Sequence, residues 1–565
     1  MPDTSPLLSH FYLMLDGAVA FEDLMNDVME ITIENSLHLP DVATIMLHDP
    51  HLKWIDADAL APGKAVVVTA KGASGEELIF DGEIVELEPD FHPSTQILTV
   101  RAFDRLHRLS IGQRTRTFVN YTDGDLVKQL AKEVGLRAQT GPTTQVYKHI
   151  FQHNQTNLAF LRARAAALGY LLYVQGDTLH FEPPRSAGQA IPLEWGATLS
   201  EFHPRMTTVG QTSGVTVRGW DPATRQEIVG HAKNGQGAPQ VGEQKSGGEM
   251  TQGAFKVDPQ GESVLRPVRS QAEADMLAQA LADQRASRFI EADGTCAGNP
   301  KIVAGSSVQI SAVGTRFSGV YFITSATHVY SVQSGYVTRF SVSGLHPSTL
   351  LSVLQPQQVG VAASASHAMG LMVGIVTDNQ DPLQQGRVKV RYPSLTSDHA
   401  SDWARLVSVG AGADRGIEFI PEVNDEVLVG FEMGDIDHPY VLGGLWNGKD
   451  APPFASKAIS GGKVVLRHIG SREGHYIAFV ESDDTKGIDI VDTSNNTIAL
   501  NAKEKKLEIR CSGNALIKAD GNISVEAQQD LTLKSAGGKI TMASSGMKIE
   551  SNGTLDIKGV TINLN

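Results

Sequence analysis

An eight-residue repeat near the C-terminal end constrains this chain more than any other feature. The lines "ISVEAQQD" and "LTLKSAGG", residues 523–538, nearly repeat one another, and similar lines continue to the last residue. Each line has an apolar residue at its start and another two positions later, so both side chains lie on one face of a short strand. The second apolar positions are Ile509, Ile517, Val525, Leu533, Met542, Ile549, Ile557 and Leu564.

Such short strands need partners. A strand of about four residues cannot enclose a core, and repeats of this kind become stable by stacking on their neighbours. We predict that three chains share one prism, that the second apolar positions form its trimer core, and that the prism leaves few free sheet edges. The alternative is a single-chain solenoid, in which 507–565 would make only about two and a half triangular turns.

Composition limits the function classes. With 565 residues, 41% of them hydrophobic, the chain can form several domains. A net charge of -15 and the lack of a Lys/Arg block argue against nucleic acid as a partner. The distant Cys296 and Cys511 predict neither a disulfide framework nor a metal site. The N-terminus lacks a secretory signal pattern, so we expect synthesis in the cytoplasm.

Turn residues and alternation divide the chain into five regions. Residues 1–350 are predicted to form a β-barrel hub region with a few inserted helices, among them "DGDLVKQLAKEVG", "QTNLAFLRARAAALG" and a helix capped by Ser270 and Glu273. Residues 351–369 read as a linker, 370–450 as a small barrel of the oligonucleotide/oligosaccharide-binding (OB) type, 451–506 as connector strands, and 507–565 as the spike. The expected fold class is therefore mainly β.

Three stretches of the sequence contain residues that could form catalytic or binding sites. Asp398, His399 and Asp402 lie in a loop, where acidic residues are usually solvated. "GAGADRG" lacks the strand-then-helix setting of a dinucleotide loop. His475, Asp483 and Asp484 lie near Ser471 and Ser482, but no nucleophile elbow is present. We therefore predict no catalytic residue, metal or cofactor, and no enzyme activity.

The barrel motifs carry a resemblance to a known family. "VGIVTDNQDPLQQGRVKVRYP", "SDWARLVSVGAG" and "GIEFIPEVNDEVLVGFEMGDIDHPYVLGGLWNG", followed by the octads, resemble spike proteins of contractile injection machines. These include the valine-glycine repeat spike (VgrG) of type VI secretion and the hub-spike of extracellular phage-tail-like particles. "TNLAFLRARAAALGYLLYVQGDTLHF" resembles the hub of the extracellular particles more than that of type VI spikes.

The resemblance implies a function and partners. It implies a homotrimeric structural spike whose hub contacts baseplate and inner-tube proteins and which touches a target membrane only on puncture. A PAAR-type tip protein would dock at the C-terminal end, on Ile562, Leu564 and Asn565. Octads near 539–547 are irregular, and strict Val-x-Gly lines are absent. A tail-associated cell-wall hydrolase and a receptor-binding fibre remain the alternatives.

Overall fold

The protein is described here from a computed structural model. It describes residues 10–72, 75–93, 95–184, 189–221, 224–233, 235–263, 267, 268, 270–331, 335–344, 370–395, 400–536, 541 and 548–563. The predicted linker, 351–369, lies outside the described residues. The chain divides into two compact units, residues 1–449 and 450–565. In both units strands outnumber helices among the regular elements, which confirms the predicted mainly β fold class.

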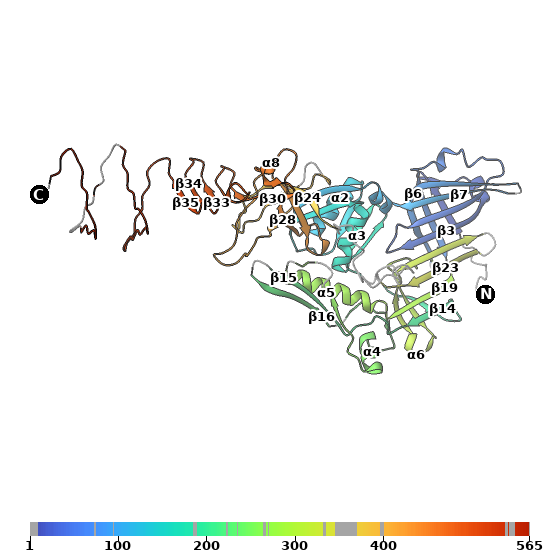
Figure 1. Ribbon diagram of the computed structural model, residues 1–565. Coiled ribbons are helices and arrows are strands. Elements are labelled where there is room, and N and C mark those ends of the chain that lie inside the picture. Colours follow the sequence, from blue (N-terminus) through green and yellow to red (C-terminus); the bar gives the residue numbers. More distant parts are fainter. Residues whose placement is uncertain are drawn as a thin grey trace, which may run out of the picture. The chain divides into compact units, whose positions relative to one another are not determined.

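The largest element of the first unit is an 11-stranded sheet in the order β14-β19-β23-β22-β3-β4-β7-β6-β5-β1-β2. Its blue and yellow-green strands, such as β3 and β23, come from distant parts of the sequence (Figure 1). Alternating residues of these strands, including Ile31, Ile45 and Val100, form the main core. The strands are β1 His10–Leu15, β2 Ala18–Val19, β3 Val28–Ser36, β4 Val42–His48, β5 Ala65–Gly72, β6 Gly75–His92, β7 Thr95–Asp104, β14 Leu199–Met206, β19 Ile290–Ala297, β22 Ser325–Ser331 and β23 Gly335–Val342.

A second core joins two helices to two small sheets. Both predicted helices form as expected: Thr122 and Thr156 cap their N-termini, and Gly169 ends the second in the left-handed conformation. Leu158, Leu161 and Ala165 face this core. The elements are α1 Glu22–Asp27 and η1 Asp58–Leu60 beside the first sheet, then η2 Arg105–Ser110, β8 Arg114–Tyr121, α2 Asp123–Glu133, β9 Arg137–Thr140, β10 Tyr147–Gln155, α3 Asn157–Leu168, β11 Leu171–Gln175 and β12 Thr178–Glu182.

The rest of the hub consists of two further layers. Ser270 accepts a hydrogen bond from the Glu273 N–H and so caps the third predicted helix, α5 Gln271–Ala286. This helix packs on β15 and β16, and a Cβ at Gly230 would meet the Ala274 backbone at 2.3 Å. The remaining elements are β13 Ile191–Glu194, β15 Gly214–Asp221, β16 Gln226–Ala232, β17 Gln240–Val241, α4 Gly247–Phe255, β18 Gln260–Ser263, β20 Ser307–Ser311, α6 Gly314–Phe317 and β21 Gly319–Phe322.

A five-stranded barrel follows, in the order β25-β24-β27-β28-β26. Val376, Val390, Val427 and Val429 fill its core, and Phe151 from β10 of the hub packs into the same cluster. Its elements are β24 Met372–Asp378, β25 Lys389–Arg391, β26 Arg405–Leu406, β27 Glu426–Phe431, η3 Glu432–Gly434 and β28 Pro439–Gly444. A barrel of the predicted class is therefore present in the fold.

The second unit begins with a short helix and a two-stranded hairpin. An antiparallel five-stranded meander, β31-β32-β33-β34-β35, comes next. These elements are α8 Ala455–Ala458, β29 Ile459–Ser460, β30 Lys463–Val464, β31 Leu466–Gly470, β32 Tyr476–Glu481, β33 Lys486–Val491, β34 Thr497–Asn501 and β35 Lys506–Arg510. Because β35 contains Leu507 and Ile509, the first octad line is the last strand of this sheet.

Two carboxylates are buried beside one another at one end of the large sheet. The Asp104 N–H donates to the Asp41 carbonyl at 3.0 Å, and Asn35 donates to the Asp41 carboxylate at 2.8 Å. Burial raises the pKa of Asp104 to about 8, with repulsion from Asp41 adding to the shift, and burial raises the pKa of Asp41 to about 6. The folded protein therefore holds protons that the unfolded chain releases from about pH 4.

We expect Asp104→Asn to stabilise the hub at alkaline pH. Above pH 4 the wild-type free energy of unfolding falls until the pair has ionised, near pH 8. In the wild type the Asp104 carboxylate accepts a hydrogen bond from the Leu106 N–H at 3.0 Å. The amide oxygen of an asparagine can accept the same hydrogen bond, and the side chain carries no charge. At pH 8.5 the free energy of unfolding of the variant should exceed that of the wild type by on the order of 2 kcal/mol. Thermal unfolding at a series of pH values should also show that the stability of the variant depends much less on pH. Asp56→Asn, at an exposed site, is the control; equal slopes in all three proteins would contradict the prediction.

Candidate assembly interface

One face of the meander is almost wholly apolar. Strand register places its side chains in two rows across the sheet, because residues directly opposite one another share a face. One row is Ile469, Ile477, Ile490, Ile498 and Ile509; the other is Phe479, Ile488, Leu500 and Leu507. We call these nine residues the apolar face. Arg467, which pairs with Glu481, stands at the end of the second row.

The apolar face is exposed in the single chain. Eight of the nine residues have exposed fractions from 38% at Ile477 to 71% at Ile509, and Ile488 is half-buried. On the opposite face Glu508 accepts from Lys506 and Arg510 at 2.7 Å each and Asp489 lies in the same row, but Ala478 in that row is only 2% exposed and Phe454 packs edge-on against Tyr476. A contiguous exposed apolar patch on one face of a sheet marks an interaction surface.

Tight turns hold the meander in this register. At the β33–β34 turn, Asp492 accepts hydrogen bonds from the backbone N–H groups of Ser494 and Asn496, at 2.9 and 2.8 Å. The Asn496 side chain also donates to Asp492 and lowers the pKa of that carboxyl. Asn495 and Lys505 take positive φ in successive turns. Because a slip of one residue would send every apolar side chain to the opposite face, these turns determine the interface.

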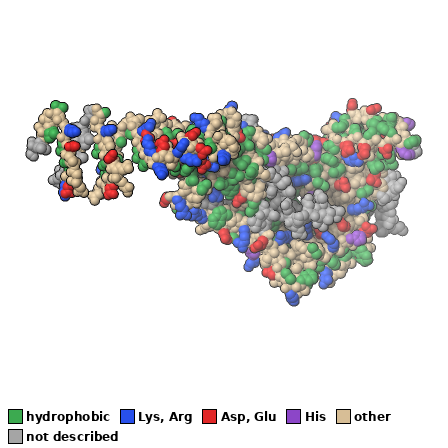
Figure 2. Space-filling model, in the orientation of Figure 1, with side chains coloured by type: hydrophobic (Ala, Val, Ile, Leu, Met, Phe, Trp, Pro, Cys, Tyr) green, Lys and Arg blue, Asp and Glu red, His purple; other side chains and the backbone are tan. Residues whose placement is uncertain are grey.

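The octads continue the apolar face as exposed side chains. Exposed fractions are 84% at Ile517 and 65% at Val525, and Leu533, Ile549, Ile557 and Ile562 are also exposed. Figure 2 shows these apolar side chains beside Lys, Arg, Asp and Glu along the C-terminal segment. Met542, Leu564 and Asn565 lie outside the described residues. In the single chain the predicted core positions therefore have no apolar cover.

The octads after Arg510 differ from the prediction that every line is a strand. Within the described stretches 511–536 and 548–563 no strand is assigned. Figure 1 shows this segment as an open winding trace rather than stacked strands. A strand requires its N–H and C=O groups to pair with a neighbour, and one chain supplies none in these stretches. The sequence pattern predicts which residues face inward but does not say which chain pairs with them.

Sequence reasoning missed the apolar face itself. Residues 451–506 were expected only to connect the barrel to the spike. The signal was present as period-two alternation in "YIAFVE", "GIDIV" and "TIALN", which places two apolar residues on one side of each strand. The eight-residue spacing did not reveal this alternation. Turns of unequal length join these strands, so the strands do not recur at that spacing.

The polar groups weighed as active sites are not assembled. Ser471 accepts from the His475 N–H at one end of β32, whereas Ser482 and Asp483 lie past the other end. Asp483 pairs with Lys486 at 3.1 Å. Asp402 accepts from the Trp403 N–H at 2.8 Å, and Asp398 and His399 lie outside the described residues. "GAGADRG" forms a hairpin-like loop in which the Gly412 N–H donates to the Arg415 carbonyl.

Among the described residues no group of three or more His, Cys, Asp or Glu side chains could hold a metal ion. No helix in the described part is long and apolar enough to span a membrane. Cys296 is buried and Cys511 exposed, and both are free thiols.

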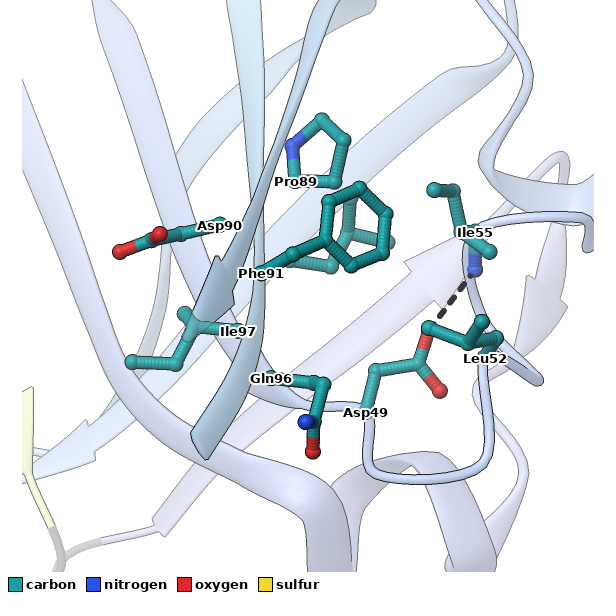
Figure 3. A pocket seen from close by; sticks show the side chains of 9 residues that line it. Asp49, Leu52, Ile55, Pro89, Asp90, Phe91, Gln96 and Ile97 are labelled. Atoms are coloured by element: carbon teal, nitrogen blue, oxygen red, sulfur yellow. Dashed lines mark hydrogen bonds between the residues drawn. The ribbon is translucent and has the colours of Figure 1, made fainter. Parts of the chain in front are cut away.

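A small hollow beside β6 and β7 is structural (Figure 3). Its lining includes Leu52, Phe91 and Asp49. The Asp49 carboxylate accepts hydrogen bonds from the backbone N–H groups of Lys53, Trp54 and Ile55, at 2.7 to 3.1 Å. This carboxylate shapes the loop, and the hollow offers no chemistry of its own.

The barrel turn in "DNQDPLQQGR" is built around Asp381. Its carboxylate, 3% exposed, accepts from Arg387 Nε at 2.9 Å and Nη2 at 2.6 Å and from the backbone N–H groups of Leu383 and Gln385. The Arg387 hydrogen bonds hold the pKa of Asp381 far below its usual range. The turn in turn brings Arg387 and Lys389 over the Trp403 ring.

We expect Asp381→Ala to destabilise the barrel by about 3 kcal/mol, because a buried guanidinium and several N–H groups lose their acceptor together. Thermal unfolding of the barrel transition measures this loss. Glu418→Ala, at an exposed barrel position, should unfold as the wild type does. Unchanged stability of the Asp381 variant would show that the turn is held by other contacts.

The hub sheet, the OB barrel and the one-sided sheet define a β-rich assembly subunit. The family model described as the Alg8 N-terminal domain matches residues 8–331, more than half of the chain, so the chain belongs to that family. A second model, described as the type VI secretion system/phage-baseplate injector OB domain, matches residues 372–446.

Individual proteins agree with these matches. The spike protein VgrG3 of Vibrio cholerae is 36% identical over 74 residues, 12% of this chain and 7% of that protein. The actin cross-linking toxin VgrG1 of Vibrio cholerae is 33% identical over 75 residues, 13% of this chain and 7% of that protein. This chain thus spans less than a tenth of either relative. In fold, it is similar to a chain of the Francisella PdpA–VgrG complex, lidded form, with a TM-score of 0.54, 9% identity, and coverage of 90% of this chain and 81% of that chain. The predicted resemblance to VgrG-like spike proteins is confirmed.

Proposed function

We propose that this chain is the structural hub and spike of a contractile injection system and works as a homotrimer. The observation that carries the proposal is the exposed apolar face, which continues into the exposed octads. Three copies related by a three-fold axis would bury three such faces against one another and give each octad two partner chains. The OB-domain match and the fold similarity to a VgrG-containing complex support a spike role for the chain that carries this face.

The trimer accounts for the structure better than a single-chain solenoid does. A solenoid would pair its own octads as strands, and the described stretches after Arg510 contain none. It would also leave the apolar face of the meander uncovered, because that face precedes the octads in a separate sheet. A shared prism covers both regions with one arrangement. Its mechanical advantage is that unfolding one side requires separating three chains.

The partners that we propose are those that the resemblance to spike proteins implies. The hub would contact baseplate and inner-tube proteins, and a PAAR-type tip protein would cover the last layer at Ile562, Leu564 and Asn565. The target membrane would be contacted only on puncture. We propose no enzymatic step: the candidate catalytic groups lie apart, and VgrG3 is named a spike protein, although VgrG1 is named an actin cross-linking toxin.

The solution mass of the full-length chain tests the proposal. Light scattering should give three times 60.6 kDa. A monodisperse monomer would contradict the shared prism. It would then favour the alternative functions, the cell-wall hydrolase and the receptor-binding fibre. A trimer that hydrolyses cell-wall material, with turnover lost on changing one carboxylate or histidine, would support the hydrolase. A trimer that needs 507–565 for target adhesion but not for particle assembly would support the fibre.

A further inference from the structure

An exposed arm extends from the OB barrel between β26 and β27. We call residues 407–423 the barrel arm. Its two sides run back along each other: the Ile417 N–H donates to the Val409 carbonyl at 3.2 Å. Nearer the tip, the Gly412 N–H donates to the Arg415 carbonyl at 3.0 Å. The arm is therefore a hairpin with hydrogen bonds of its own rather than an irregular loop.

Two glycines hold the sides of the arm close together. Gly410 has a φ of 75° and Gly416 a φ of 137°, in the range that L side chains rarely adopt. A Cβ at Gly416 would lie 2.8 Å from the Gly410 carbonyl oxygen. The sequence therefore specifies this narrow conformation of the arm.

The apolar side chains of the barrel arm are exposed in the single chain. The exposed fractions are 74% at Val409, 63% at Phe419 and 49% at Ile417. The other exposed apolar residues of the arm are Val407, Ile420 and Val423. A group of large apolar side chains on one projecting element marks an interaction surface.

The outer face of the barrel next to the base of the arm combines cations with aromatic rings. Val388 and Ala404 pair with each other and are buried, so the residues that alternate with them face outward. Arg405 also pairs with Tyr440, and its guanidinium lies 5.6 Å from the centre of the Tyr440 ring. We call the outward residues the basic patch: Lys389, Arg391, Trp403, Arg405 and Tyr440.

The basic patch is net positive. Its three cations form no ion pair with any residue that the structure describes, whereas the neighbouring Arg387 is bound to Asp381. Two carboxylates border the patch, and each accepts a hydrogen bond from a neutral group: Asp402 from a backbone N–H at 2.8 Å, and Glu432 from the Tyr440 hydroxyl at 3.0 Å. The patch therefore suits a partner that is both anionic and apolar, because the rings offer apolar area between the cations.

The barrel arm is opposite in charge to the basic patch. It carries three carboxylates, Asp414, Glu418 and Glu422, against the single guanidinium of Arg415. We propose that in the trimer the barrel arm of one copy lies on the basic patch of the next copy's barrel. This inference rests on the proposed homotrimer and adds to it a second interface, at the level of the barrels.

A second copy fits both surfaces better than an unrelated partner. Each chain has one arm and one patch on different parts of its barrel, so a ring of three copies satisfies all of them with one repeated contact. The apolar side chains of the arm would cover the aromatic rings, and its carboxylates would meet the cations, which fixes the orientation of the contact. A nucleic acid would suit the patch but be repelled by the arm, and a lipid bilayer would suit the apolar side chains but not the carboxylates.

Charge reversal with rescue in the full-length protein tests the contact. Lys389→Glu with Arg405→Glu reverses the patch, and Asp414→Lys with Glu418→Lys reverses the arm. Hydrogen–deuterium exchange of peptides covering 407–423, corrected for intrinsic rates, should show about tenfold less protection in each double variant than in the wild type. The protein that combines all four substitutions should regain the wild-type protection, because the attraction is restored with the signs exchanged.

Two single substitutions serve as controls. Lys449→Glu, at an exposed site beyond β28, should keep the wild-type protection of the arm. Glu418→Ala should change it little, because two other carboxylates remain on the arm and one exposed ion pair contributes little.

Light scattering on the same samples distinguishes a failure of this inference from a failure of the proposed function. A wild-type trimer whose arm exchanges as an unprotected backbone would overturn the arm-to-patch contact and leave the trimer standing. A monomer would overturn both, and an arm protected in a monomer would show that its own chain covers it. Within a trimer, unchanged protection in both double variants, or a loss that the four substitutions together do not reverse, would also overturn the contact.

Discussion

A Val525→Asp substitution is expected to prevent stable assembly of the C-terminal spike. Val525 is the second apolar residue of its octad, and it is exposed in the single chain. In the proposed trimer, one substitution places three carboxylates in a single buried layer, and each unpaired buried charge costs several kcal/mol. The full-length variant should be monomeric or should have a protease-sensitive end, measured by light scattering and by limited proteolysis.

The neighbouring residue supplies a matched control. Ser524 alternates with Val525, so Ser524→Asp adds the same charge on the outward side of the same line. It should assemble as the wild type does. A fully assembled, heat-resistant Val525→Asp protein would show that this position does not face the shared core. Failure of both variants would show that charge anywhere in the segment blocks assembly, which would contradict the inward and outward assignment.

An Ile490→Asp substitution is expected to disrupt assembly at the base of the spike. Ile490 lies in the row between Ile477 and Ile498, at the centre of the apolar face. Chains truncated after Arg510 should still form trimers if this face is an interface in its own right. Within that truncated protein, Ile490→Asp should give monomers, because the octads can no longer compensate; light scattering and sedimentation measure the outcome.

The opposite face of the same sheet provides the comparison. Ala499 pairs with Asp489 and Glu508 on the opposite face, so Ala499→Lys adds a charge between two carboxylates that can pair with it. This control should remain trimeric. A truncated wild type that is monomeric would restrict the interface to the octads. A trimeric Ile490→Asp protein would indicate that the apolar face is covered by something other than a second and third copy.

Local interactions made several elements predictable. Thr156 and Gly169 bound α3 because a side-chain cap and a left-handed glycine act within one helical turn. The turn in the barrel was recognisable because Asp381 accepts its hydrogen bonds from donors that lie within six residues along the chain. In each case the interacting residues are close in sequence, so the local sequence pattern includes most of the interactions that stabilise the element.

The partners of distant residues were not predictable in the same way. No local pattern places His149 of β10 against Asp437 and Ala400, some 250 residues later. Asp41 and Asp104 share a buried site only because β4 and β7 pair. Register in the meander likewise converts separate alternating strands into one continuous face.

The sequence by itself thus determined the classes of element and the OB barrel, since alternation and turn chemistry depend on neighbouring residues, whereas the inward positions of the octads stay a prediction. The tertiary structure alone decided that the apolar face begins at β31, that the first octad belongs to that sheet, and that the hub and barrel are joined through His149. The physical reason is that burial and long-range hydrogen bonding depend on which segments meet in space, and many pairings are compatible with the same local pattern.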